Sequence, residues 1–474
     1  MLKIQNIMTV ALGLCTLSSG MVFSAEKTKA KKKRPNIILC MADDLGWGDP
    51  AYNGNKIIKT PNLDAMANNG IRFDRFYSSS PVCSPTRGSC ITGRHPYRYG
   101  IFGANVGHMK DQEITLAEIL KDQGYVTGHF GKWHLGTLTT TEKDANRGGE
   151  KGKEHFSPPQ LNGFDVCFST ESKVPTYDPM ITPIGWGKNT QADKPSGTYY
   201  WNEKGEKVTD NLEGDDSRII MDRAIPFIEN AVENDEPFFT IIWFHAPHLP
   251  VLAGEKHRSM YEGYTNEEKN YYGCITALDD QMGRLRAKLK ELGIEDETML
   301  WFTSDNGPEG AKLTTNRPGS AGPFKGRKRS LHEGGVRVPG ILVWPQEVKK
   351  SVVTDIPCST LDYFPTILDA LGYQIKGKPS PIDGHSLLPL IHGKMKARNL
   401  PIGFESKKQI AMNDDRYKLY SSDMGQTFEL YDMVNDKEEQ HDIASSKPEI
   451  VKELAKKLAA WRESCQHSLN GADY

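Results

Sequence analysis

Short apolar runs alternate with amphipathic stretches along most of the chain. Four mainly apolar runs predict buried β-strands, at residues 37–41, 125–130, 238–244 and 299–303. The stretches between them carry helical periodicity. Because strands that alternate with helices form parallel sheets covered by helices, we expect an α/β fold with a large, mainly parallel sheet flanked by helices.

Two of the expected helices have clear boundaries. Apolar residues recur every three or four positions over 274–292, and Gly293 is a typical stop. Thr115 and Glu118 have the spacing of a capping box and predict a second helix start.

The middle and the end of the chain differ from this pattern. Residues 137–209 lack clear periodicity, which is typical of functional loops. Within them, Tyr199, Tyr200 and Trp201 could stack on a sugar or form a buried edge strand. After residue 350 the sequence predicts a helix, two adjacent strands and a terminal amphipathic helix. We therefore expect a catalytic domain over 26–350 and a smaller α+β subdomain over 351–474.

The first 25 residues have the layout of a secretory signal peptide. An early lysine, Lys3, precedes an apolar core, and small residues follow it. A lipoprotein signal at Cys15 is disfavoured, because Leu14 stands where a small residue is expected. No other apolar run is long enough to span a bilayer. The sequence predicts a secreted or periplasmic protein without a membrane span.

Charge and cysteine content narrow the class further. The 59 basic and 61 acidic residues nearly cancel, so the chain lacks the electrostatic footprint of a nucleic-acid-binding protein. The eight cysteines have neither a disulfide framework nor a zinc pattern. Cys83 stands out, because it lies in the turn-forming sequence PVCSPTRGSC rather than in apolar surroundings.

Chemically active side chains follow each of the four predicted strands. In open α/β sheets ligands bind beyond the carboxyl ends of the strands, so we expect these groups to meet at one edge. Each pair alone could instead be a turn or a helix cap. The groups are Asp43, Asp44, Lys132, His134, His245, His248, Asp305 and Asn306.

The segment CSPTRGSCITGR resembles the signature of the type I sulfatases, Cys-x-Pro-x-Arg followed by Thr-Gly. Further blocks resemble this family in its own order: PNIILCMADDLGWGD, GKWHLG, FHAPH, TSDNG and KRSLHEGGVRVP. The resemblance implies the alkaline-phosphatase-like α/β fold with a small C-terminal subdomain. It also implies that a dedicated maturation enzyme oxidises Cys83 to formylglycine.

The same resemblance implies the site residues. One Ca²⁺ would be bound by oxygens of Asp43, Asp44, Asp305, Asn306 and the modified Cys83. Arg87 would hold the hydrated aldehyde, Lys132 and Lys328 would contact the sulfate, His134 would act as the base and His245 would protonate the leaving oxygen. The family's spacing selects Lys328 over Lys325, Arg327 and Arg329. His248 and His332 are left open between substrate-facing and structural roles.

These observations predict a sulfuric ester hydrolase. One hydroxyl of the hydrated aldehyde attacks sulfur, and the other, after losing its proton, expels sulfate. The resemblance extends to secreted bacterial polysaccharide sulfatases, which implies a sulfated carbohydrate as substrate. Two alternatives stay open: hydrolysis of phosphate or phosphonate esters on the same scaffold, and a non-catalytic carbohydrate-binding protein in which Cys83 stays a thiol.

Overall fold

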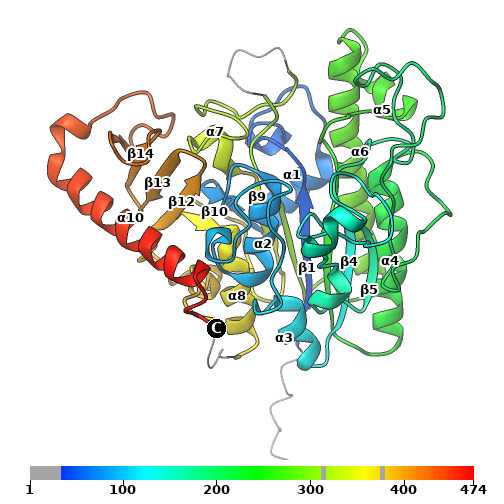
Figure 1. The fold of residues 1–474 in the computed structure, drawn as a ribbon, viewed down its shortest axis with the longest axis horizontal. Helices are drawn as coiled ribbons and strands as arrows, with labels where there is room; N and C mark the ends of the chain where they lie inside the picture. The colour runs from blue at the N-terminus through cyan, green and yellow to red at the C-terminus, as the bar shows by residue number, and fades with distance from the viewer. Residues whose placement is uncertain (1–33, 311–316, 374–378) are drawn as a thin grey trace, which may run out of the picture. The chain divides into compact units, whose positions relative to one another are not determined.

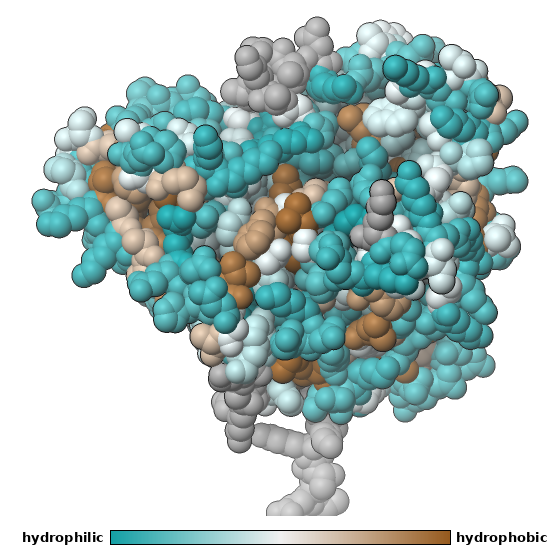
Figure 2. Space-filling model, viewed as in Figure 1, coloured by the Kyte–Doolittle hydropathy of each residue, from teal (hydrophilic) through white to brown (hydrophobic). Residues whose placement is uncertain are grey.

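A computed structural model describes residues 34–310, 317–373 and 379–474. The signal peptide expected at residues 1–25 lies outside the described residues. None of the helices in the described ranges is both long and apolar enough to cross a membrane. Figure 2 shows one face of the molecule, on which hydrophilic residues predominate and hydrophobic ones form scattered patches.

An eight-stranded sheet forms the centre of the fold, in the order β10-β2-β9-β7-β1-β6-β4-β5. Only β9 runs antiparallel to its neighbours. The four predicted strands are the adjacent strands β7, β1, β6 and β4, which confirms their assignment. The bounds are β1 Asn36–Ala42, β2 Ile71–Phe73, β4 Val126–Lys132, β5 Val166–Thr170, β6 Phe238–Trp243, β7 Thr298–Ser304, β9 Gly340–Val343 and β10 Val352–Thr354.

Both faces of this sheet are buried under hydrophobic cores. Successive side chains of a strand point to opposite sides, so one strand contributes to both cores. On β1, Ile37, Leu39 and Met41 join one hydrophobic core, whereas Ile38 and Cys40 join the other. The first core is covered by α2 (Cys83–Thr92), α3 (Leu116–Asp122) and α8 (Tyr363–Ala370). The second is covered by α1 (Pro61–Asn69), α4 (Asp216–Glu233) and α6 (Asn266–Glu291) (Figure 1).

Element boundaries confirm some expectations and correct others. The capping box of Thr115 and Glu118 is present at the start of α3. The long helix α6 begins at Asn266 rather than at residue 274, because Thr265 and Glu268 form a second capping box there. The region 137–209 is mainly irregular, as expected, but it also contains strand β5.

A second, antiparallel sheet is formed near the end of the chain by β12 (Ile402–Ser406), β13 (Gln409–Asn413), β14 (Tyr417–Ser421) and β15 (Glu429–Asp432). Helix α10 (Pro448–Leu469) covers it, and Leu454 and Leu458 pack on Ile410 and Leu430 (Figure 1). The predicted fold class is therefore confirmed. The domain boundary at residue 350 stays a prediction; β10, which follows it, pairs with β2 in the large sheet.

Three short strands and three short helices complete the connections. The strands β3 (Phe76–Tyr77), β8 (Arg337–Val338) and β11 (Cys358–Ser359) pair in a small sheet. The helices are α5 (Glu255–Arg258), α7 (Glu333–Val336) and α9 (Leu388–Ile391). Helix α7 directly follows the loop that carries Lys328. Its first residue, Glu333, contacts Lys418 on β14 of the second sheet.

Candidate active site

The carboxyl ends of the central strands bring acidic residues together. Asp43 and Asp44 follow β1, and Asp305 and Asn306 follow the neighbouring strand β7. The register pairs Ala42 with Ser304, so both acidic segments begin at the same level of the sheet. The Asp44 backbone N–H donates to Asp305 Oδ1 at 3.1 Å, and Asn306 Nδ2 donates to Asp44 Oδ1 at 2.7 Å.

Three cations neutralise the three carboxylates of this cluster. Lys132 Nζ lies 2.6 Å from Asp43 Oδ2, and Lys328 Nζ lies 2.6 Å from Asp44 Oδ1. Arg87 Nη2 lies 2.7 Å from Asp305 Oδ2. All six side chains are buried. Such burial is tolerated only because each charge has a partner, since an unpaired buried charge costs several kcal/mol.

Two oxygens of this cluster fit a cation site. Asp43 Oδ1 and Asn306 Oδ1 are buried, and neither has a hydrogen-bond partner among the described residues. Ligand atoms of Asp43, Cys83 and Asp305 lie within 4.8 Å of one another. Burial and then the charge of Asp43 raise the pKa of Asp305 to about 7, which a divalent cation would reverse. Carboxylate and amide oxygens are the ligands that Ca²⁺ prefers, so the donor set fits this ion.

Backbone strain is concentrated at the site. Asp44 and His134 have φ angles of 69° and 58°, in the left-handed region that residues other than glycine rarely adopt. The bond from Asp44 N to Asp305 fixes one of them, and a bond from His134 N to the Glu171 carbonyl (3.0 Å) fixes the other. Strain of this kind persists where the surrounding contacts hold a functional geometry.

Cys83 is the first residue of α2 and lies within the same cluster. Val82 precedes it in extended conformation and makes no side-chain cap, so the helix N-terminus is open to an anion. The Cys83 side chain is buried, and burial raises the pKa of its thiol although Lys132 and Lys328 oppose the rise. One turn along the helix, the Arg87 guanidinium lies 5.1 Å from the ring centroid of Trp243.

His134 lies beside the cluster with one ring nitrogen held. Its Nε2 lies 2.8 Å from Asn105 Oδ1, whereas Nδ1 is buried without a partner among the described residues. Burial and then the charge of Lys132 hold the pKa of His134 well below its usual value. The lowered pKa favours the neutral ring, and Nδ1 is the nitrogen without a partner among the described residues.

His245 is held inside the fold by both of its ring nitrogens. Its Nδ1 pairs with Asp216 Oδ2 at 2.8 Å, and its Nε2 bonds to Thr170 Oγ1 at 2.7 Å. The residue is fully buried. Both ring nitrogens are thus engaged inside the protein in this arrangement, and the expected role of His245 as the acid stays a prediction.

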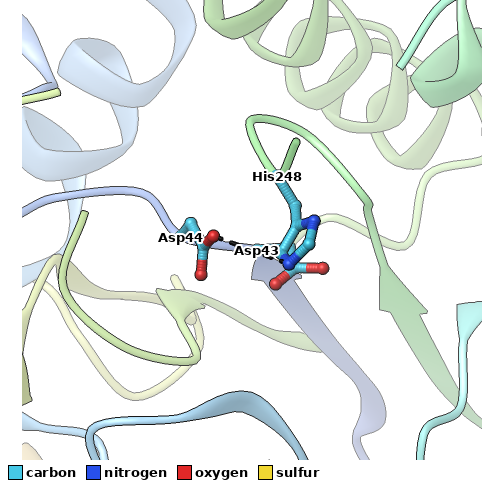
Figure 3. Close-up of side chains that lie close together, drawn as sticks. All are labelled: Asp43, Asp44 and His248. Atoms are coloured by element: carbon cyan, nitrogen blue, oxygen red, sulfur yellow. Dashed lines mark ion pairs between the residues drawn. The ribbon is translucent and has the colours of Figure 1, made fainter. Parts of the chain in front are cut away.

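His248, whose role the sequence left open, lies beside the acidic cluster. Figure 3 shows its ring beside Asp43 and Asp44, in the loop after β6, and its Nε2 lies 3.7 Å from Asp44 Oδ2. Its Nδ1 bonds to the Leu249 carbonyl, which leaves Nε2 toward the cluster. Burial lowers the pKa of His248 to about 4. A negative charge beside the ring, such as that of a sulfate ester, would raise this pKa.

The other candidates near Lys328 point elsewhere. Lys325 Nζ lies 3.2 Å from Tyr431 Oη, and Arg327 donates to the Glu309 carbonyl. Arg329 pairs with the Glu309 carboxylate. His332 Nδ1 lies 3.2 Å from Glu439 Oε1, which gives it a structural role. Among these residues, Lys328 alone reaches Asp44.

Several residues of the site were not found from the sequence. Asp216, Thr170 and Asn105 hold the two histidines, but they lie far apart in the chain and in no recognisable motif. Within the aromatic triplet, Tyr200 and Trp201 are buried. Tyr200 stacks on Phe168 with ring centroids 3.9 Å apart. The buried alternative therefore holds for these two residues, and Tyr199 alone stays half-exposed.

A sheet edge that combines oxygen ligands, three cations and an open helix N-terminus defines a hydrolase of anionic esters. The family model described as Sulfatase matches residues 35–373, and a model described as N-sulphoglucosamine sulphohydrolase, C-terminal, matches residues 321–464. The chain belongs to the sulfatase family, a family of sulfuric ester hydrolases with the alkaline-phosphatase-like fold.

Curated relatives and solved structures agree with this assignment. The chain is 34% identical to N-acetylgalactosamine-6-sulfatase of Canis lupus familiaris over 76% of its own length and 66% of the relative. It is 30% identical to human steryl-sulfatase, over 76% of its own length and 70% of the relative. The solved structure of Ps i-CgsB in complex with k-i-k-neocarrahexaose aligns with a TM-score of 0.77 and 27% identity, over 90% of this chain and 93% of that one. The chain thus spans about two thirds of the length of the curated relatives.

Proposed function

We propose that this protein hydrolyses sulfate esters of a carbohydrate through a formylglycine formed from Cys83, with one Ca²⁺ bound beside it. The observation that carries the proposal is the position of Cys83. It opens a helix, and its ligand atom lies within 4.8 Å of those of Asp43 and Asp305. A buried thiol with a raised pKa is a poor nucleophile in such a place, whereas an oxygen nucleophile suits it.

The chain's own residues would bind and orient the sulfate group. Asp43, Asp44, Asp305 and Asn306 would hold Ca²⁺, which would offset the negative charge of the ester and of the attacking oxygen. With the cation in place, Lys132 and Lys328 would be released from Asp43 and Asp44 to contact sulfate oxygens. Hydrated formylglycine supplies two hydroxyl groups on one carbon, one to attack sulfur and one to release sulfate by regenerating the aldehyde.

Arg87 and two histidines would complete the reaction. Arg87 lies one turn beyond Cys83 and would hold the hydrated side chain, while its bond to Asp305 fixes the guanidinium. His134 would take the proton whose loss releases sulfate, because Asn105 orients its ring and Nδ1 is free to accept. We assign the protonation of the leaving oxygen to His248 in place of His245, because Nε2 of His248 faces the cluster.

A carbohydrate is the substrate class that the comparisons favour. The first relative is named for a sulfated N-acetylgalactosamine, and Ps i-CgsB was solved with a neocarrahexaose. Steryl-sulfatase, named for a different class, is a less similar relative. The signal-like start of the sequence supports export to the periplasm or the medium. A formylglycine-generating enzyme of the host would be the partner that oxidises Cys83.

Coexpression with a formylglycine-generating enzyme tests this proposal. Mass spectrometry of the peptide that contains residue 83 reports the modification, and free sulfate is measured on a panel of sulfated oligosaccharides. 4-Nitrophenyl sulfate and 4-nitrophenyl phosphate are run beside them. We expect conversion of Cys83 and sulfate release that requires it. A preference for the phosphate ester, or a modified protein that is inactive on every sulfate, would overturn the proposal.

A further inference from the structure

A hollow of about 430 Å³ lies next to the catalytic residues, a volume typical of small-ligand sites. Its walls come from two loops of the irregular region and from the residues that follow β5. Ser172 connects it to the site, because Ser172 Oγ lies 3.5 Å from His134 Nε2. A sugar whose sulfate occupied the cluster would therefore extend toward this hollow.

The charged side chains that line the hollow are all positive. Lys143 and Lys173 line it together with Asn146, Thr198 and Tyr199, and the lining includes no carboxylate. Within the described part of the chain, neither lysine forms an ion pair. By contrast, the nearby cations Arg329 and Lys207 are paired with Glu309 and Glu142. The positive charge of the hollow is therefore not offset by a carboxylate in its own lining.

Lys173 is the lysine nearer to the reaction. It directly follows Ser172, its side chain is exposed, and its ammonium lies 5.5 Å from the ring centroid of Trp186. Burial of part of the side chain, together with the positive charges of Lys132 and Lys328, lowers the pKa of Lys173. An anion at this position would relieve that repulsion.

The walls of the hollow are fixed before any ligand arrives. Arg147 pairs with Glu171 at 2.9 Å, which ties the first loop to the end of β5. Buried Asp144 accepts from Tyr199 N and from Trp201 Nε1 at 3.2 and 2.7 Å, and Ala145 N donates to the Gly197 carbonyl. A preformed site binds without a large cost of ordering its side chains.

We infer that this hollow binds a second anionic group of the substrate, with Lys173 as its main contact and Lys143 as support. The inference rests on the proposed sulfatase function and narrows it. The preferred substrate then carries, besides the sulfate that is removed, a carboxylate or another sulfate on the same sugar or on its neighbour. A charge-assisted hydrogen bond from an ammonium to such a group is among the stronger polar contacts in proteins.

The test compares two classes of substrate on the full-length, formylglycine-containing enzyme. The reference substrates carry one anionic group: 4-nitrophenyl sulfate and a sulfated N-acetylhexosamine. The second class adds a linked uronic acid in one arm and a second sulfate in the other, which distinguishes the two sources of charge. We expect Lys173→Gln to lower kcat/KM on the second class by on the order of ten- to a hundredfold, mainly through KM, and to leave the reference substrates unchanged.

Two control variants sharpen the result. Lys173→Arg keeps the charge and should retain most of the preference for the second class. Lys204→Gln removes the same charge from an exposed turn of the same region and should change neither class. Equal losses on both classes, or a wild-type enzyme that prefers one anionic group, would overturn the inference. Absence of sulfate release from every substrate would instead refute the proposed sulfatase function.

Discussion

At the residue scale, the two histidines after β6 have different surroundings and should have different roles. His248 faces the acidic cluster with one ring nitrogen, whereas His245 is held on both sides by Asp216 and Thr170. The sequence FHAPH supplies both rings, and the family resemblance gives the acid role to His245. The directions of the two side chains favour His248 in the role that we propose, and the two variants below test it.

His248→Ala should slow sulfate esters of sugar alcohols much more than 4-nitrophenyl sulfate. Only a poor leaving group needs a proton, and general acid assistance is typically worth ~10²–10⁴-fold. Steady-state kinetics on the two substrate types measures the difference. Equal losses on both would remove His248 from this role.

His245→Ala serves as the matched comparison and should behave differently. It leaves the buried Asp216 carboxylate with the Tyr200 hydroxyl as its remaining side-chain partner among the described residues, so the protein should lose stability. Activity on both ester types should then fall together, and the thermal transition should move down. A folded His245→Ala variant with a selective loss on sugar esters would restore the first assignment.

Removal of the cation should destabilise the protein. Asp43, Asp44 and Asp305 lie together only in the folded protein. A divalent cation that binds there therefore stabilises the folded state by its binding free energy. We expect a chelator to lower Tm and Ca²⁺ to restore it in proportion to its concentration. The same titration on Asp305→Asn should show a weaker response. A Tm that changes with neither the chelator nor Ca²⁺ would contradict the metal site.

At the element scale, contiguous apolar runs were the strongest signal in the sequence. They placed the four central strands, and with them the edge on which the carboxylates and Lys132 meet. Strand β5 was missed because it is short and its first residue, Val166, is 39% exposed. The first two turns of α6 were missed because residues 266–273 are mainly polar and lack an apolar periodicity. The capping box of Thr265 and Glu268 is the sequence signal that marks this helix start.

Gly131, within β4, places the following Lys132 in the site. Its φ is 105°, and a Cβ at this position would lie 2.0 Å from the Trp243 carbonyl oxygen on the neighbouring strand. Gly131→Ala should therefore shift β4 and Lys132, with a loss of stability of ~2 kcal/mol or more and a loss of activity. Gly205→Ala is the control, because its φ of 72° is also positive but no atom lies within 4 Å. Denaturant unfolding and sulfate release measure both variants; equal effects would contradict the packing argument.

At the scale of the whole molecule, a buried charge cluster joins the second sheet to the catalytic loop. Lys418 on β14 contacts Glu333 and Glu439, each at 2.9 Å, and all three side chains are fully buried. Glu333 opens α7 and also accepts from Tyr77 and Arg337. Lys328 lies in the same segment, five positions before Glu333. The sequence predicted two of the four strands, β14 and β15, and the terminal helix of this part. Buried ion pairs between distant segments leave no local pattern to find.

This cluster predicts a specific dependence of stability on pH. Burial alone would raise the pKa of Glu439, but Lys418 and His332 outweigh it and lower the pKa from 4.5 to about 2. A carboxyl whose pKa is depressed by folding stabilises the folded state above its unfolded pKa, and this contribution is lost as the pH falls from about 4.5 toward 2. Lys418→Met should remove the contribution and leave two carboxylates buried beside each other, at a cost of ~3–5 kcal/mol at neutral pH.

Denaturant unfolding at pH 7 and at pH 3 measures this effect. The wild-type protein should lose more stability between the two values than Lys418→Met does, because protonation of Glu439 costs the variant nothing further. Lys457→Met is the control, since Lys457 pairs with Glu453 on the exposed face of α10 and exposed pairs contribute ~0–1 kcal/mol. Since the cluster holds the segment that presents Lys328, a folded Lys418→Met variant should also bind sulfate esters with a raised KM. An unchanged KM together with the stability loss would show that the second sheet supports the fold without positioning Lys328.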